Sequence, residues 1–229
     1  MTPFSKLRGT IPERIAEIRR TLPQSVRLIA VTKQVSVGAM REAYNAGIRD
    51  FGESRVQEAE AKQAQLQDLT NVTWHLIGHL QTNKAQKALE QFEWIHSVDS
   101  LKLAQRLNRL AEQLPRKPQI LLQVKLLPDP NKYGWSASGL LKDLPELNRC
   151  EFLNIEGLMT ITPLGLTDPE VLAVFQETRE LANKITRQSW PHIRMNQLSM
   201  GMSNDYELAV KAGATMIRLG RVLFGDRPN

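Results

Sequence analysis

A lysine that follows a short apolar run is the first residue of this chain whose type and setting could do chemistry. Lys33 comes after the residues LIAV and shares the alternation of Ile29 and Val31, so we expect its ammonium to be poorly hydrated. Poor hydration lowers the pKa of a lysine and leaves more of the free amine that forms an imine with an aldehyde. Taken alone, however, Lys33 is better interpreted as a strand-end lysine that reaches solvent or pairs with Glu53.

Two glycine turns near the C-terminus could bind an anion. In LSMGMSNDYELA, Ser199 can donate a hydrogen bond, and Gly201 lets the backbone approach a ligand. Asn204 and Glu207 then have the spacing of a capping box at the start of a helix, whose free N–H groups attract anions. A second turn follows at Gly220-Arg221. The alternative is an ordinary capped loop, because the acidic residues of the first turn would oppose a phosphate.

Arg218 lies within an apolar stretch, TMIRLG. A buried guanidinium requires a partner because it does not deprotonate. A structural ion pair with a carboxylate such as Glu156 is one interpretation, and contact with a ring nitrogen of a ligand is the other.

Other possible catalytic patterns are not supported by the residues around them. His75 and His79 have the spacing of a helical metal pair, but WHLIGH is typical of a strand followed by a turn and brings no third ligand. His96 is interpreted as a barrel histidine whose hydrogen bonds are satisfied. The sequence has no nucleophile elbow, no phosphate-binding GxxxxGK[ST] motif and no cysteine motif. Metal catalysis and serine hydrolysis are therefore not expected.

The elements that must position these residues alternate between short strands and amphipathic helices. Eight apolar segments are predicted as strands: RLIAVTK from Arg27, IRDFG from Ile48, VTWHLIG from Val72, FEWIHSV from Phe92, QILLQVKL from Gln119, FLNIEGLMTI from Phe152, IRMNQLS from Ile193 and TMIRLG from Thr215. Polar residues concentrate where these segments end. Such residues would meet at one end of a parallel sheet.

Helical stripes of apolar residues occur between the strands. They are Ile11, Ile15, Ile18 and Leu22; Val37, Met40 and Tyr44; Leu103, Leu107, Leu110 and Leu114; Leu140, Leu144 and Leu147; and Val171, Phe175, Thr178, Ala182 and Ile185. Gly47 and Gly213 stand where helix C-caps are expected. Alternating units of this kind predict an α/β (β/α)8 TIM barrel with an extra N-terminal helix. A doubly wound open sheet is the alternative, but its glycine-rich first turn is missing.

Length and composition fit one barrel. With 229 residues and 41% hydrophobic content, residues 1–229 are predicted to form a single domain, with residues 1–26 as a leading helical segment. We expect a cytoplasmic protein, because Cys150 is the single cysteine and the sequence shows no signal peptide or apolar membrane span. The net charge of +6 is spread along the chain, so nucleic-acid binding is not expected.

The quoted segments together resemble the pyridoxal phosphate homeostasis proteins, also called the YggS or proline synthase co-transcribed type. The matching motifs include LIAVTK, FGESRVQEA, WHLIGHLQTNK, NKYGW, GLMTI and LSMGMSNDYELAVKAGATMIRLGRVLFG, in order and spacing, from about Arg27 to Gly225. The resemblance implies a barrel like the N-terminal domain of alanine racemase (fold type III), with pyridoxal 5'-phosphate in its mouth.

The resemblance also assigns roles to individual residues. It implies that Lys33 carries the cofactor as a Schiff base and that Arg218 faces the pyridine nitrogen. The other residues that it places at the cofactor are Ser199, Gly201, Gly220 and Arg221 at the phosphate, and Met159 and Ser54 nearby. Two positions depart from the common pattern. Ser54 stands where many members have asparagine, and Lys125 adds a positive charge where asparagine is common.

The expected function is to store, buffer or transfer pyridoxal phosphate without catalysis, in vitamin B6 and amino-acid homeostasis. A cation at the ring nitrogen disfavours its protonation and makes the ring a weaker electron sink. The chain also stops just after the eighth strand, so a second domain with an opposing base is not expected. A weak amino-acid racemase is the main alternative; a lysine-dependent aldolase and a basic RNA-binding module are further ones. We expect a monomer, with apo-enzymes that accept pyridoxal phosphate as partners.

Overall fold

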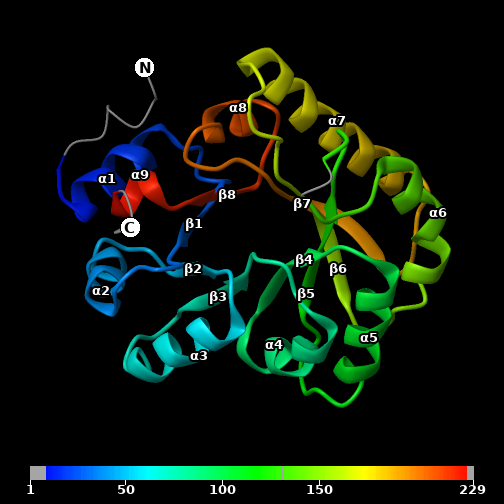
Figure 1. Cartoon of the computed structure of the whole chain (residues 1–229), viewed down its shortest axis with the longest axis horizontal. Coiled ribbons are helices and arrows are strands. Elements are labelled where there is room, and N and C mark those ends of the chain that lie inside the picture. Colours follow the sequence, from blue (N-terminus) through cyan, green and yellow to red (C-terminus); the bar gives the residue numbers. More distant parts are fainter. Residues whose placement is uncertain (1–8, 130–131, 226–229) are drawn as a thin grey trace.

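The computed structural model describes residues 9–129 and 132–225, and within them eight parallel strands close into a barrel in sequence order (Figure 1). The strands are β1 (Arg27–Val31), β2 (Asp50–Glu53), β3 (Thr73–Leu76), β4 (Trp94–Val98), β5 (Gln119–Val124), β6 (Asn154–Thr160), β7 (Ile193–Ser199) and β8 (Met216–Leu219). Each predicted strand is present, so the (β/α)8 barrel is confirmed. Strand β7 has the predicted bounds, and the other strands are shorter than predicted; β1, for example, ends two residues before Lys33.

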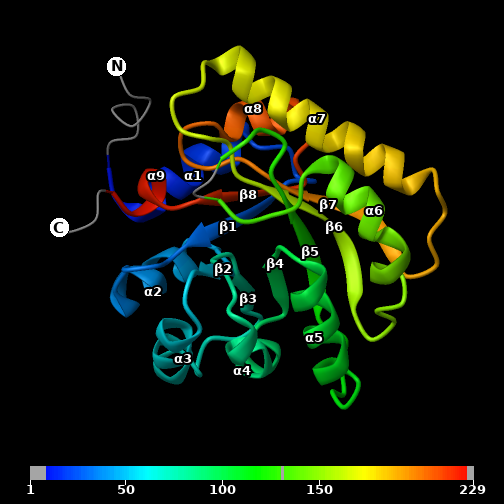
Figure 2. The same cartoon turned by 45° about the vertical axis from the view of Figure 1, so that its right-hand side comes forward.

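Helices surround the strands (Figure 2). They are α1 (Ile11–Thr21), α2 (Val37–Asn45), α3 (Val56–Gln65), the 3-10 turn η2 (Thr82–Lys84), α4 (Ala85–Gln91), α5 (Leu101–Ala111), α6 (Ala137–Leu147), α7 (Asp168–Thr186), α8 (Tyr206–Lys211) and α9 (Arg221–Phe224). The leading helix α1 confirms the first apolar stripe. Helices α3 and α4 were not predicted, because alanines such as Ala59, Ala85 and Ala88 supply much of their buried faces in place of large apolar residues.

The structure agrees with the two predicted C-cap glycines but not with the predicted capping box. Gly47 and Gly213 adopt φ angles of 91° and 96°, in the left-handed region where glycine follows a helix. The start of α8 corrects the sequence prediction, since its N-cap residue is Asp205 rather than Asn204. The physical reason lies in the turn, where the Asp205 carboxylate accepts a hydrogen bond from the Met202 N–H at 2.6 Å.

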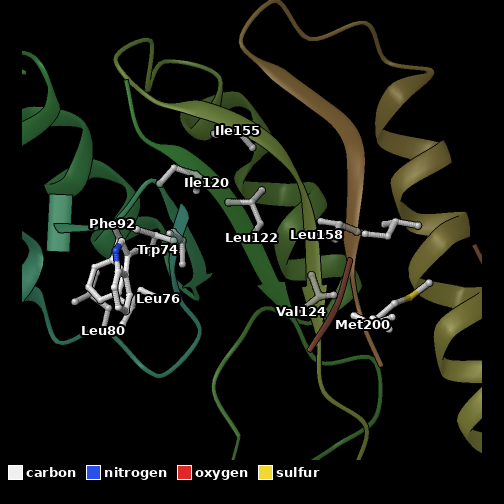
Figure 3. Packing of buried hydrophobic residues seen from close by; sticks show 14 of the residues in the cluster. Trp74, Leu76, Leu80, Phe92, Ile120, Leu122, Val124, Ile155, Leu158 and Met200 are labelled. Carbon is white, nitrogen blue, oxygen red and sulfur yellow. The ribbon is translucent and has the colours of Figure 1, made fainter. Parts of the chain in front are cut away.

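The apolar core has an outer and an inner part. The outer part fills the space between the sheet and the helices, and Figure 3 shows Trp74, Leu76, Leu80 and Phe92 gathered in it. The inner part consists of side chains of alternating strand residues that point into the barrel: Ile29, Leu121, Met159 and Met216. None of the helices in the described residues combines the length and the apolar character required to cross a bilayer.

The contact between β7 and β8 differs from the other contacts of the barrel. Among the described residues, the two strands are in register through the single pair Ser199 and Met216. Side chains extend this contact, because Thr215 Oγ1 accepts a hydrogen bond from the Leu198 N–H at 2.8 Å and lies 2.8 Å from Gln197 Oε1. Polar groups therefore contribute to the closure of the barrel at this point.

Candidate functional site

A cavity of about 470 Å³ opens at the carboxyl ends of the strands. This volume is in the range of small-molecule and cofactor sites. Its wall includes residues in or directly after β1, β2, β3 and β8 and a long contribution from the segment after β6: Val31, Lys33, Ser54, Ile77, residues 161–166, Asp168, Val171, residues 202–205, Arg218, Gly220 and Arg221. Of the eight predicted site residues, the structure thus brings five to one cavity: Lys33, Ser54, Arg218, Gly220 and Arg221.

Lys33 reaches the cavity from a tight turn rather than from the strand itself. Val31 and Lys33 both line the cavity, so the predicted alternation continues past the end of β1. The turn is closed by a hydrogen bond from the Val35 N–H to the Thr32 carbonyl at 2.9 Å. Gln34 has a φ of 59°, which is uncommon for a residue with a side chain and indicates that its surroundings hold this conformation.

An ionic cluster of Lys62, Glu53 and Glu58 forms hydrogen bonds to that turn. Lys62 Nζ donates to the Thr32 carbonyl at 2.6 Å, to Glu53 at 2.8 Å and to Glu58 at 2.7 Å. Glu53 also accepts from the Thr32 hydroxyl at 2.6 Å, and Glu58 accepts from the Gln34 N–H at 2.6 Å. The cluster therefore holds the residues on both sides of Lys33 in place.

The two carboxylates of the cluster respond differently to their surroundings. Glu53 is fully buried, and this burial raises its pKa against the opposing effect of hydrogen bonds from Lys62 and Thr32. One of its oxygens, Oε2, has no hydrogen-bond partner among the described residues. Glu58 is less buried, so the hydrogen bonds from Lys62 and Gln34 outweigh its desolvation and lower its pKa. Lys62 is thus the positive charge that stabilises the ionised form of both carboxylates.

Arg218 is 3% exposed, and its guanidinium faces neutral acceptors rather than a carboxylate. Nη1 donates to Ser199 Oγ at 2.7 Å, and Nη2 donates to the Thr160 carbonyl at 2.9 Å. The suggested partner Glu156 lies instead 3.8 Å from Arg194. Burial lowers the pKa of Arg218 to about 10, against the opposite effect of the Asp205 charge. A buried cation that forms no ion pair with a carboxylate of the described residues is suited to a polar ligand in the adjoining cavity.

A serine that was not among the predicted site residues organises the turn after β8. Ser203 Oγ accepts hydrogen bonds from the Gly220 N–H at 3.3 Å and from the Val222 N–H at 3.4 Å. Ser203, Gly220 and Arg221 all line the cavity. Both N–H groups use Ser203 Oγ as their acceptor, so the Ser203 hydroxyl proton can donate to a ligand in the cavity, beside the Arg221 cation. A hydroxyl donor next to a guanidinium is suited to a phosphate. The signal that could have found Ser203 was its place two residues after Gly201 in the same loop.

Three predicted residues lie elsewhere, since none of them lines the cavity. Ser199 is fully buried, where it binds Arg218 and His96. Gly201 adopts a φ of 92°, and a Cβ there would lie 2.6 Å from Ala209 Cβ, so this glycine allows α8 to pack closely. Met159 belongs to the apolar cluster inside the barrel. Direct contact of these residues with a cofactor stays a prediction.

The two departures from the family pattern have different settings. Ser54 lines both the main cavity and a neighbouring cavity of about 440 Å³, so its hydroxyl lies between the two. Lys125 does not line either cavity. Its Nζ donates to carbonyls of its own loop, at 3.4 Å to Asp129 and 3.1 Å to Lys132. The ammonium of Lys125 therefore stabilises that loop through hydrogen bonds to its backbone.

The histidines lie in different settings along β3, β4 and the loop after β3. His75 is buried within β3, whereas His79 lies in the loop beyond it, 2.8 Å from Asp99. His96 is buried with both ring nitrogens in hydrogen bonds, as predicted for a satisfied barrel histidine. The residues that the structure describes contain no cluster of acidic, histidine and cysteine side chains able to hold a metal ion.

A family model described as the alanine racemase N-terminal domain matches residues 8–228. Among curated proteins, the pyridoxal phosphate homeostasis protein of Synechocystis sp. is 53% identical over 216 residues, which cover 94% of this chain and 98% of the relative. The protein of the same name from Pseudomonas aeruginosa is 38% identical over 232 residues, 96% of each chain.

Solved structures show the same likeness. PipY of Synechococcus elongatus, in a structure with pyridoxal phosphate bound, matches with a TM-score of 0.90 and 55% identity over 94% of this chain and all (100%) of PipY. Alanine racemase of Clostridium difficile matches with a TM-score of 0.78 over 96% of this chain and 57% of the racemase. At 15% identity, this second likeness concerns the fold alone.

Proposed function

The chain belongs to the pyridoxal phosphate homeostasis family and carries the alanine racemase N-terminal domain; from that premise we propose that it binds pyridoxal 5'-phosphate in the mouth of the barrel without catalysing a reaction. The observation that carries the proposal is the donor set of the main cavity. Lys33, Arg218 and the Ser203–Arg221 pair place an amine, a buried guanidinium and a hydroxyl donor beside a second guanidinium around one space of about 470 Å³. These groups match the aldehyde, the ring nitrogen and the phosphate of pyridoxal phosphate.

Each side of the cavity has a separate task in this proposal. Lys33 Nζ holds the aldehyde carbon of the cofactor as a Schiff base. Arg218 donates a hydrogen bond toward the ring nitrogen, while Ser203, Gly220 and Arg221 bind the phosphate. Ser54 lies near the cofactor from the β2 side. When bound, pyridoxal phosphate supplies a reactive aldehyde and a ring that can withdraw electrons.

The non-catalytic role is favoured over a racemase by two observations. The curated relatives from Synechocystis sp. and Pseudomonas aeruginosa are named for homeostasis, whereas the likeness to the alanine racemase of Clostridium difficile is limited to 15% identity and 57% of that chain. Arg218 keeps a fixed cation at the proposed place of the ring nitrogen, where it disfavours ring protonation and makes carbanion chemistry less favourable.

The same proposal includes a wider setting for the protein. We propose that it is a cytoplasmic monomer and that apo-enzymes requiring pyridoxal phosphate accept the cofactor from it. The buried thiol of Cys150 is consistent with a reducing compartment. A cavity that opens at one end of the barrel gives the cofactor a route to leave.

Titration of the purified protein with pyridoxal phosphate tests the proposal. We expect a new absorbance band that saturates at one cofactor per chain, and a borohydride-reduced adduct that maps to the peptide containing Lys33. Absence of the band, or an adduct on another lysine, would overturn the binding mode. Incubation of the holoprotein with L- and D-alanine, followed by chiral analysis, tests the non-catalytic role, and rapid racemisation would contradict it.

The proposed phosphate site yields a second measurable effect. Replacing Ser203 with alanine should weaken pyridoxal phosphate binding about tenfold, because one hydrogen bond to a charged group is lost. Binding of pyridoxal, which has no phosphate, should change little. Fluorescence or absorbance titration of both ligands measures the two affinities, and Ser138→Ala, at a serine on α6 outside the cavity, serves as the control. An equal loss for both ligands would mean that Ser203 does not act through the phosphate.

A further inference from the structure

Hydrogen-bonded polar side chains cross the inside of the barrel and end at Arg218. Arg218 Nη1 lies 2.7 Å from Ser199 Oγ, which in turn lies 2.8 Å from His96 Nδ1. His96 Nε2 lies 2.9 Å from His75 Nδ1, and His75 Nε2 lies 2.9 Å from Asp50 Oδ1. These residues belong to β8, β7, β4, β3 and β2, so the interior series connects the cavity wall to the amino end of β2.

The donor capacities of these groups define one direction for the series. A guanidinium only donates and an ionised carboxylate only accepts. Ser199 therefore accepts from Arg218 and donates to His96, His96 donates to His75, and His75 donates to Asp50. Each histidine then carries one proton, on Nε2, and every polar group of the series is satisfied.

The opposite direction is disfavoured by the charge that it requires. If His96 donated to Ser199, His75 would have to donate from both ring nitrogens and so become an imidazolium. Burial lowers the pKa of His75 and lowers that of His96 well below its usual range, against the pull of the Asp50 carboxylate on His75. The neighbouring cations Arg27 and Arg218 add to this effect, so both histidines are neutral.

This series determines how Arg218 is held. Both terminal nitrogens of the guanidinium have acceptors, Ser199 on one side and the Thr160 carbonyl on the other. A serine hydroxyl can rotate, but the His96 acceptor leaves its lone pairs facing Arg218. The two histidines in turn have fixed tautomers because Asp50 accepts at the end of the series.

We propose that His96 and His75, anchored by Asp50, are positioning residues that fix Arg218 against the ring nitrogen of bound pyridoxal phosphate. The inference rests on the proposed function, since it gives Arg218 a ligand to face. It assigns a role to His75 and His96 beyond satisfying each other in the barrel. Their removal should therefore change the electronic state of the bound ring as well as the stability of the protein.

The test compares His96→Leu with His96→Gln and with the control Thr178→Val. Leucine removes the acceptor for Ser199, whereas glutamine can still accept and donate. Thr178 is also buried and polar, but its hydroxyl donates to the Val174 carbonyl within α7, away from the cavity. The readouts are the affinity for pyridoxal phosphate and the 15N resonance of its labelled ring nitrogen in the complex.

His96→Leu should weaken binding about tenfold and shift the 15N resonance, while His96→Gln should recover most of both and Thr178→Val should change neither. A folded His96→Leu variant with the affinity and resonance of the unchanged protein would overturn the inference. If His96→Leu does not fold, Asp50→Ala decides, because it removes the acceptor at the end of the series: a shifted resonance supports the positioning role, and an unshifted one contradicts it. Failure of the unchanged protein to bind pyridoxal phosphate would instead refute the proposed function.

Discussion

Replacing Lys33 with alanine should abolish the borohydride-trapped adduct and weaken retention of pyridoxal phosphate by at least about 100-fold, or about 2.7 kcal/mol. The physical reason is that Lys33 lines the cavity with the amine proposed to bond to the cofactor, whereas the other groups contribute hydrogen bonds. Equilibrium dialysis and mass spectrometry after reduction measure the two effects.

Two further variants separate the covalent bond from charge alone. Lys33→Arg keeps a cation at the site but provides no amine for imine formation, so it should lose the trapped adduct as well. Lys87→Ala changes an exposed lysine whose Nζ lies 3.2 Å from Glu60, and it should behave as the unchanged protein. An adduct that persists in Lys33→Ala at its original yield would show that another lysine carries the cofactor.

Replacing Lys62 with methionine should lower the free energy of unfolding by about 3–5 kcal/mol at neutral pH. The substitution keeps most of the apolar volume but leaves Glu53 fully buried without its positive partner and Glu58 without a main hydrogen-bond donor. The Thr32 carbonyl also loses a donor, so the turn that carries Lys33 should loosen and cofactor affinity should fall. Urea unfolding measures the stability change, and Lys87→Met should stay within about 0.5 kcal/mol.

The loss in Lys62→Met should depend on pH. Burial already raises the pKa of Glu53, and removing the Lys62 hydrogen bond should raise it further. A folded carboxyl with a raised pKa binds its proton more tightly than the unfolded chain, so its contribution to stability falls as pH rises through the folded pKa. The deficit should consequently be smaller at about pH 5 than at about pH 8. A deficit that is equal at both pH values would contradict the assigned charge of Glu53.

The barrel could be predicted from the sequence because its signals are local. Apolar runs of strand length and helices with large apolar stripes recur in a fixed order, and Gly47 and Gly213 stand between them. Helices α3 and α4 lack that contrast, since alanine-based faces differ little in hydrophobicity from their polar neighbours. Helices whose buried side chains are small could therefore not be predicted from hydrophobic spacing.

The candidate site could be predicted only in part, for a different reason. Lys33 and Arg218 stand out as charged residues in or beside apolar strands, so the sequence alone draws attention to them. Ser199 is the last residue of β7 and Ser203 lies in the loop that follows, and which hydroxyl faces the cavity depends on the turn geometry around Gly201. The partners of Arg218 and the contact of Lys62 with the Thr32 carbonyl join residues that are distant in sequence, and no local pattern identifies them.

The contact between β7 and β8, which contains a single register pair among the described residues, connects closure of the barrel with ligand binding. Among the described residues, Ser199 makes the one register pair of β7 with β8, and backbone hydrogen bonds from Thr215 to Leu198 and from Met200 to Met216 lie beside it. Ser199 also accepts a hydrogen bond from Arg218, which lines the cavity from β8. A ligand that contacts both Lys33, just after β1, and the turn after β8 would hold together strands that lie next to the β7–β8 contact. We therefore expect ligand binding and barrel closure to be thermodynamically linked, so that a bound ligand makes local opening between β7 and β8 less favourable. The affinity for the ligand would then depend on the strands that close the barrel as well as on the residues that line the cavity.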